Sequence, residues 1–350
     1  MRAGVRDRGA RVAHVARDDC STLMRGALLL GLLAKSTSAA ADPQEIIDVW
    51  MVPHAHCDVG WLMSVDGYFN PTHYDGSENT DSVSNILTTV TQSLDADPEL
   101  RFIWSETKWI EMWWPKQTVA MQAAFKRIIK SGQLEIVGGG WSQNDEVTTA
   151  YYDVIDNQVT GHEFLKRTGL LDECPQPGRC IRFGWQIDMF AGFSGATPNL
   201  WAMAGYDGMF LRWEGTDEQK AHFLATGGYE WLWESSASLT ANRSRIWTHS
   251  MYQNYGSLTG FRGDPPIPGV GFDWDDGGGA MPVNASNVGG FATAIKQFVT
   301  DRKVAFQGPI LAVWGSDYRY GSARGGAIFS CYPLQVAVHL ARVSRHSVAS

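Results

Sequence analysis

The stretch IIDVWMVPHAHCDVGW, residues 46–61, determines how the rest of the chain is interpreted. It begins as a continuous apolar run and ends in a polar turn that holds His54, His56 and Asp58. Continuous apolar runs are typical of strands that are buried on both faces of a parallel sheet. Side chains two positions apart point to the same face of an extended strand, so we expect these three side chains to share a direction.

The same arrangement recurs along the chain, with apolar runs that each end in a polar or aromatic cluster. The runs are RFIW (101–104), LEIVGGG (134–140), IRFGWQI (181–187), GMFL (208–211) and ILAVWGS (310–316). Helical patterns separate them at residues 80–98, 119–132, 151–169 and 292–303. Thr80 or Asp81 is available to cap the first of these helices, and Gly132 suits the end of the second.

Strands that alternate with helices predict an α/β fold built from βαβ units. These units are right-handed and place the C-terminal end of every strand on one face, which carries the active site in such folds. We therefore expect the polar clusters to converge. The alternation stops between Ser235 and Gly290, where Gly, Pro, Asn, Asp and Tyr dominate. A loop of this length that contains Tyr252, Tyr255 and Trp274 favours a segment that faces a substrate.

Composition excludes one class of partner and hints at another. The formal net charge is −8 and there is no long basic run, which argues against nucleic-acid binding through contacts to phosphates. The chain has 15 tryptophans and 37 glycines, which suits sugar binding because indole faces stack on pyranose rings. With 350 residues, the chain is long enough for one large domain or two smaller ones.

The N-terminal region predicts entry into the secretory pathway. Residues 24–41 have the features of a signal peptide, with an apolar core too short to span a bilayer permanently. Residues 1–23 are interpreted as leader, and Met24 as the true start; a buried internal helix is the alternative. Asn242 and Asn284 begin glycosylation sequons, and Cys174 and Cys180 predict a local disulfide. Lysosome, vacuole and export stay open, as does the oligomeric state.

The polar clusters contain the residue types of a metal site and of a hydrolase. An imidazole nitrogen beside carboxylate oxygens suits Zn²⁺, although buried structural histidines produce the same spacing. Asp188 directly follows the run IRFGWQI, and Asp317 has the same position after ILAVWGS. Asp188 could instead cap the helix near residues 197–205. Glycoside hydrolysis requires two carboxyl groups that face each other across the active site, one as the nucleophile and one as the acid/base.

Five motifs, in this order and spacing, resemble those of the class II α-mannosidases of lysosome and Golgi, glycoside hydrolase family 38. They are HAHCDVGW (54–61), GGGWSQNDE (138–146), WQIDMF (185–190), MAGYDGMF (203–210) and GSDYRY (315–320). The resemblance, closer to the lysosomal type, covers residues 46–320. It implies the family's N-terminal catalytic domain, with a parallel-strand, barrel-like (β/α)7-type fold that is incomplete at its C-terminus. Residues 321–350 are interpreted as a divergent tail.

The resemblance also implies the roles of individual residues. One Zn²⁺ per chain would be held by His56, Asp58 and Asp188. Asp188 would also be the nucleophile, and Asp317 the acid/base, of a retaining hydrolase that removes terminal α-mannose from glycoprotein N-glycans. The substrate would be contacted by Trp61, Arg212, Arg319 and Tyr255.

Departures from the family pattern keep two alternatives open. DMFAGFSG (188–195) stands where DPFGHS is usual, and no histidine here matches the family's fourth zinc ligand, since His339 and His346 belong to no motif. One alternative is therefore a catalytically inactive or mannose-binding remnant. The other is a metallohydrolase of the amidohydrolase or metallo-β-lactamase type. The lactamase-type motif requires a histidine where Val59 stands, and the amidohydrolase pattern requires further lysine and histidine ligands.

Overall fold

The computed structural model describes residues 45–321, apart from 74, 80, 177–179, 190–191, 213–214, 237, 240–244, 253–254 and 257–287, together with residues 334–338. The expected leader, the signal peptide and both sequons, Asn242 and Asn284, lie outside the described residues. Among the helices described, none combines the length and the apolar character needed to cross a membrane.

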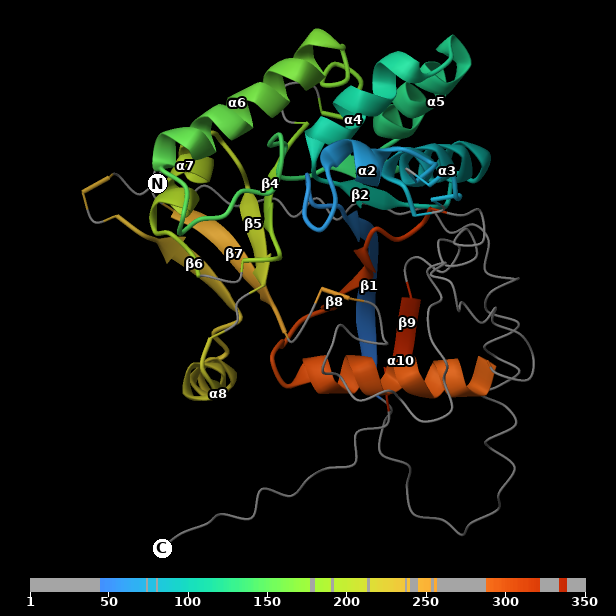
Figure 1. Ribbon diagram of the computed structural model, residues 1–350. Coiled ribbons are helices and arrows are strands. Elements are labelled where there is room, and N and C mark those ends of the chain that lie inside the picture. The colour runs from blue at the N-terminus through green and yellow to red at the C-terminus, as the bar shows by residue number, and fades with distance from the viewer. Residues whose placement is uncertain are drawn as a thin grey trace, which may run out of the picture.

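Two sheets form the frame of the molecule (Figure 1). The first has the order β3 (Leu134–Ile136), β2 (Phe102–Trp104), β1 (Glu45–His56), β8 (Ile310–Asp317), and all of these pairs are parallel. Strand β9 (Leu334–Val338) pairs antiparallel with the start of β1. The second sheet has the order β4 (Phe183–Gln186), β5 (Gly208–Arg212), β7 (Arg245–Met251), β6 (Glu230–Glu234), and only β6 is antiparallel. The α/β class with parallel strands is therefore confirmed.

The parallel strands follow one another in the order that a barrel requires. Strand β1 has β2 on one side and β8 on the other, so the first and last parallel strands are neighbours. Between β3 and β4, the N–H of Gly138 donates to the carbonyl oxygen of Phe183 at 2.7 Å. Within the described residues no ladder joins β7 to β8. The arrangement is compatible with a barrel, but closure stays a prediction.

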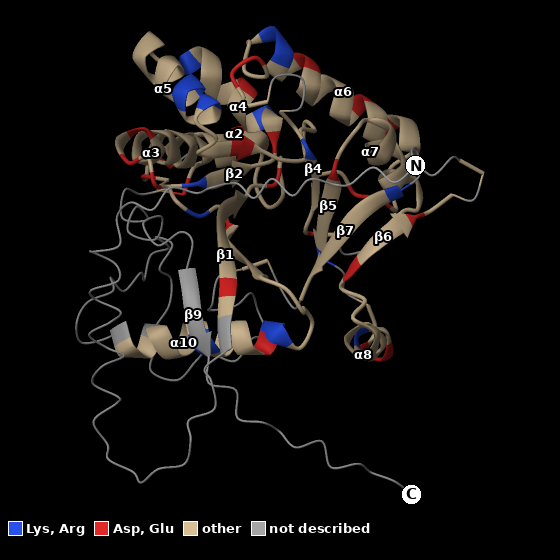
Figure 2. Ribbon diagram, turned by 180° about the vertical axis from the view of Figure 1, so that it is seen from behind, with Lys and Arg blue, Asp and Glu red and all other residues tan. Residues whose placement is uncertain are grey.

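Helices cover the outside of both sheets. The bounds are α2 (Val65–Phe69), α3 (Val83–Ala96), α4 (Thr107–Trp113), η1 (Trp114–Lys116), α5 (Val119–Lys130), α6 (Tyr151–Arg167), α7 (Ala196–Met203), α8 (Asp217–Thr226) and α10 (Val288–Lys303). Helices α2 to α5 lie near β2, and α10 crosses near the start of β1 (Figure 1). Basic residues occupy the last turns of α5, α6 and α10, where the helix dipole favours them (Figure 2).

Helix α3 shows why the helical patterns were readable from sequence. Its apolar residues recur at helical spacing, and Val83, Ile86 and Leu94 are fully buried. The expected cap at Thr80 or Asp81 is wrong, because Ser82 adopts the extended conformation before the first turn and its hydroxyl accepts the Asn85 N–H.

The second sheet corrects the expectation of a long loop between Ser235 and Gly290. Residues 245–251 form β7, which lies between β5 and β6 inside the sheet. This strand buries Thr248, His249 and Ser250, so it has no continuous apolar run to identify it. Edge strand β6 was also not expected, while the six strands predicted from apolar runs are all present. The predicted disulfide between Cys174 and Cys180 is present as well, with a Cα–Cα distance of 5.4 Å.

Candidate active site

The C-terminal ends of β1, β4 and β8 bring the candidate residues together. His56 is the last residue of β1 and Asp317 the last of β8, and the parallel ladder places them opposite each other. Asp58 follows β1 by two residues, and Asp188 follows β4 by two. The expected convergence of polar clusters from distant parts of the chain is therefore present.

His56, Asp58 and Asp188 form a group that could hold a metal ion. One ligand atom from each lies within 4.8 Å of the others. His56 Nε2 is 3.3 Å from Asp58 Oδ1 and 3.4 Å from Asp188 Oδ2. Burial would lower the pKa of His56, but the two neighbouring carboxylates outweigh it and raise the pKa well above the usual value. One buried nitrogen facing two carboxylates is a donor set that suits zinc and related divalent ions.

The two oxygens of Asp188 face different partners. Oδ2 lies toward His56, whereas Oδ1 lies 3.3 Å from Nη1 of Arg212 at the end of β5. The Arg212 guanidinium is 5.3 Å from the centre of the Tyr255 ring. Helix α7 begins after Gly195, which is its N-cap residue, so Asp188 does not cap that helix.

Asp317 is a mostly buried carboxyl group whose surroundings favour its protonated form. Burial raises its pKa, and the negative charges of Asp188 and Asp58 add to this rise, while His56 and a hydrogen bond from Tyr255 oppose it. The Tyr255 hydroxyl donates to Asp317 Oδ1 at 3.1 Å. Tyr255 is fully buried, and burial raises the pKa of its hydroxyl, so this group stays a donor.

The remaining expected residues differ in their exposure to solvent and in their position relative to the metal-binding group. Trp61 is 62% exposed in the turn after Asp58. Arg319 is half-buried two residues after Asp317. His54 is buried between the rings of Trp185 and Tyr255, at centroid distances of 5.8 and 6.1 Å, and is not part of the metal-binding group. Burial and then the charge of His56 lower the pKa of His54 to about 3, so it is a neutral core imidazole.

Three site residues were missed by sequence reasoning. Gln143 Nε2 lies 3.0 Å from His56 Nδ1 and donates to buried Glu106 at 2.7 Å. The hydroxyl of Tyr318 donates to the Asp58 carbonyl oxygen at 2.9 Å. All three lie in segments that immediately follow predicted strands. Position after a strand was a usable signal, but no spacing rule connects these residues with His56.

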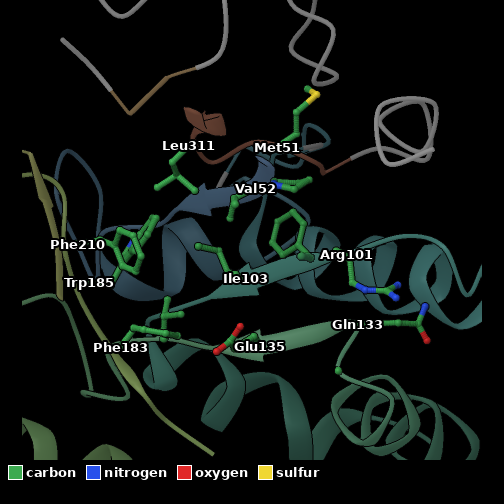
Figure 3. Close-up of a pocket in the computed structure, with 14 residues that line it drawn as sticks. Met51, Val52, Arg101, Ile103, Gln133, Glu135, Phe183, Trp185, Phe210 and Leu311 are labelled. Carbon is green, nitrogen blue, oxygen red and sulfur yellow. The ribbon is translucent and has the colours of Figure 1, made fainter. Parts of the chain in front are cut away.

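One cavity among the described residues lies away from the metal-binding group. It has a volume of about 300 Å³ and is lined mainly by apolar residues of both sheets, with the carboxylate of Glu135 among them (Figure 3). Val52, Ile103, Trp185, Phe210 and Leu311 line it. None of His56, Asp58, Asp188 and Asp317 does.

Comparison with known proteins gives consistent results. Residues 46–328 match the model for the glycosyl hydrolases family 38 N-terminal domain. A probable alpha-mannosidase from Arabidopsis thaliana is 37% identical over 235 residues, covering 66% of this chain and 21% of that protein. The lysosomal alpha-mannosidase of Cavia porcellus is 34% identical over 253 residues, covering 68% of this chain and 24% of that protein.

A solved structure agrees at the level of the fold. The alpha-mannosidase from Enterococcus faecalis V583 aligns with a TM-score of 0.52 at 16% identity, covering 81% of this chain and 27% of that one. The chain therefore spans about a quarter of the length of these relatives.

Proposed function

Because the chain belongs to glycosyl hydrolase family 38, whose N-terminal domain it matches over residues 46–328, we propose that it carries the catalytic site of a zinc-dependent retaining α-mannosidase. The proposed substrate is terminal α-linked mannose on glycoprotein N-glycans. The observation that carries the proposal is the meeting of His56, Asp58 and Asp188 at the strand ends where Asp317 also lies. Relatives named as alpha-mannosidases support it.

The residues present fit a zinc ion. His56 Nε2 is buried and has no hydrogen-bond partner, and the carboxylates of Asp58 and Asp188 lie beside it. A zinc ion bound by these three residues would supply Lewis acidity toward the hydroxyl groups of the sugar. One such ion per chain is proposed.

Asp188 is proposed as the nucleophile. Its Oδ2 belongs to the metal-binding group, and its Oδ1 is held by Arg212. In a retaining hydrolase a carboxylate attacks the anomeric carbon and forms a covalent glycosyl-enzyme. The contact with Arg212 orients the carboxylate, which reduces the reorganisation required for attack.

Asp317 is proposed as the acid/base. With its proton retained, it donates to the leaving glycosidic oxygen; once deprotonated, it accepts a proton from the attacking water. Tyr255 occupies Oδ1, so we expect the other carboxyl oxygen to carry the proton. The exposed indole of Trp61 offers an apolar face for the sugar ring, and Arg319 lies close enough in sequence to Asp317 to take part in binding.

The relatives also support a proposed location. Lysosomal alpha-mannosidases are among them, and the expected signal peptide, the two sequons and the disulfide agree with a secretory route. We propose that the protein enters the secretory pathway and acts in the lysosome or vacuole, or outside the cell.

The test is hydrolysis of an aryl α-mannoside by residues 1–350, with and without a chelator. We expect turnover that the chelator abolishes and zinc restores, with retention of anomeric configuration by NMR. Asp188→Ala should lose both activity and bound zinc. The control Asp156→Asn, on the exposed face of α6, should behave as wild type. Turnover that the chelator does not reduce would contradict the mechanism. Mannose binding without turnover would support the alternative of a catalytically inactive, mannose-binding remnant.

A further inference from the structure

Glu146 contacts the chain on both sides of Asp188. It lies in the segment between β3 and α6 and is 6% exposed. Its Oε2 accepts the N–H of Ser194, which lies six residues after Asp188, at 2.9 Å. The side chain of Gln186, which lies two residues before Asp188, and that of Thr197 also contact the Glu146 carboxyl group. One carboxyl group therefore spans the segment that carries the proposed nucleophile.

The turn that carries Glu146 is held by contacts of its own. Oδ1 of Asp145 accepts the N–H of Val147 at 2.6 Å and that of Thr148 at 3.0 Å. An aspartate side chain that accepts from the backbone two residues on stabilises a turn without help from other parts of the chain. The carboxyl group of Glu146 therefore reaches Ser194 from a fixed turn.

Both partners of Glu146 are fixed to regular elements. Gln186 is the last residue of β4 and is 1% exposed, and its Nε2 lies 3.3 Å from Asn144 Oδ1. Ser194 lies just before the N-cap residue of α7, and its Oγ accepts the N–H of Ala196 at 3.1 Å. Glu146 therefore links the end of a strand to the start of a helix.

The side-chain contacts of Asp188 do not fix its position alone. Its Oδ1 lies 3.3 Å from Arg212 Nη1, and its Oδ2 lies 3.4 Å from His56 Nε2. Both distances are longer than the ~2.7–2.9 Å of a strong charge-assisted hydrogen bond. The backbone on either side of Asp188 therefore contributes to the position of its carboxylate.

The burial of Glu146 has a cost that its remaining contacts do not offset. Its Oε1 is buried without a hydrogen-bond partner. Burying a carboxyl group with one unsatisfied oxygen destabilises a folded chain. The link across the segment of Asp188 is the feature that distinguishes this glutamate.

We propose that Glu146 is a positioning residue for Asp188. By holding Gln186 and Ser194, it fixes the backbone on both sides of the nucleophile and so sets the direction of the attacking carboxylate. This inference rests on the proposed function in taking Asp188 as the nucleophile.

The experiment compares Glu146→Met and Glu146→Gln with the control Gln133→Met. Methionine keeps the approximate size of the side chain but cannot accept the Ser194 N–H, whereas glutamine keeps the length and an accepting oxygen. Gln133 is buried just before β3, and its Nε2 donates to the carbonyl oxygens of Leu94 at 2.6 Å and Asp97 at 2.8 Å. It is therefore a matched buried side chain at the opposite end of β3 from the candidate site.

The constants kcat and KM are measured on an aryl α-mannoside at saturating zinc, and exchange of the Ser194 amide hydrogen is followed by mass spectrometry. We expect Glu146→Met to lower kcat about 10- to 100-fold with KM within about threefold of wild type, because a misplaced nucleophile raises the barrier to attack. Its Ser194 amide should exchange faster than in wild type. Glu146→Gln should keep kcat within about threefold and keep this amide protected. Gln133→Met should melt at a lower temperature with kcat and Ser194 exchange unchanged.

Three results would overturn the assignment of Glu146. The first is a Glu146→Met protein that fails to fold, or that folds and keeps the wild-type kcat or the wild-type exchange at Ser194. The second is a Glu146→Gln protein as slow as Glu146→Met, since the accepting oxygen would then not matter. The third is an equal loss of kcat in Gln133→Met, since lower stability would then explain the effect.

The wild-type chain separates this inference from the proposed function. If it shows no turnover, the proposed function fails and this inference fails with it. Wild-type turnover with kcat unchanged in Glu146→Met refutes the inference alone.

Discussion

Tyr318→Phe removes one hydroxyl group that connects the turn of Asp58 to the strand end of Asp317. The hydroxyl donates to the Asp58 carbonyl oxygen at 2.9 Å, and the N–H of Tyr318 donates to the His56 carbonyl oxygen at 2.9 Å. The ring stacks on Tyr68, with a centroid distance of 4.4 Å and an interplanar angle of 6°. Phenylalanine keeps the stacking and the backbone hydrogen bond, so the change isolates the hydroxyl contact.

The magnitude follows from one neutral hydrogen bond, about 0.5–1.5 kcal/mol. If this free energy holds Asp58 where a metal needs it, the zinc dissociation constant should rise by a factor of about 2–13. The Asp58 side chain is 33% exposed, so water can reach the turn and the lower half of the range is expected. The free energy of unfolding should fall by a similar amount.

Tyr320→Phe is the matched control for this prediction. The Tyr320 hydroxyl also donates to a backbone carbonyl oxygen, that of Trp314, at 3.0 Å, and the residue lies two positions from Tyr318. Its loss should lower the free energy of unfolding in urea without changing zinc affinity. The reasoning is refuted if both variants change zinc affinity equally, or if Tyr318→Phe binds zinc as wild type does.

Three further predictions concern the acid, a buried carboxylate and the exposed indole. Asp317→Asn should reduce kcat on alkyl mannosides far more than on activated aryl mannosides and should leave bound zinc unchanged, as metal analysis would show. Burial raises the pKa of Glu146 to about 7 in the folded chain, whereas the unfolded chain keeps the ordinary glutamate pKa of 4.5. Between these two pKa values the folded chain holds a proton that the unfolded chain has lost, so the free energy of unfolding should fall as the pH rises from about 4.5 to about 7. Glu146→Gln should remove that fall, worth about 3 kcal/mol at most, in urea melts at pH 4 and pH 8; an unchanged difference would contradict it. Trp61→Ala should raise KM and leave the melting temperature unchanged, because the side chain is 62% exposed.

Sequence patterns predicted the fold and the site correctly where a buried apolar run marks a strand and a polar residue follows the end of that strand. The segment from Pro53 to His56 is buried on both faces of β1, whereas Asp48 and Trp50 nearer its start are exposed. Asp58 and Asp188 lie two positions beyond the ends of β1 and β4, where the candidate residues meet. Strand ends predicted that these polar residues would converge, while the choice of His56, Asp58 and Asp188 as the metal-binding group came from the family resemblance.

Other features depend on contacts that no local pattern encodes. Strand β7 was missed because its buried Thr248, His249 and Ser250 are polar, and His249 is paired with Glu230 on the adjacent strand at 2.9 Å. The hydrogen bond from Tyr255 to Asp317 joins residues 62 positions apart. Such pairs are set by the packing of the two sheets.

The pairing of β1 with β8 has a consequence for how the protein is made. Asp317 and the histidine opposite it, His56, lie on two strands that are separated by about 250 residues of intervening chain. At translation rates of about 5–20 residues per second, the first of these strands leaves the ribosome roughly 13–50 s before its partner. A nascent chain therefore lacks one side of the proposed site until β8 has been synthesised, and during that interval the edge of β1 that β8 will cover is open to chaperones or to aggregation.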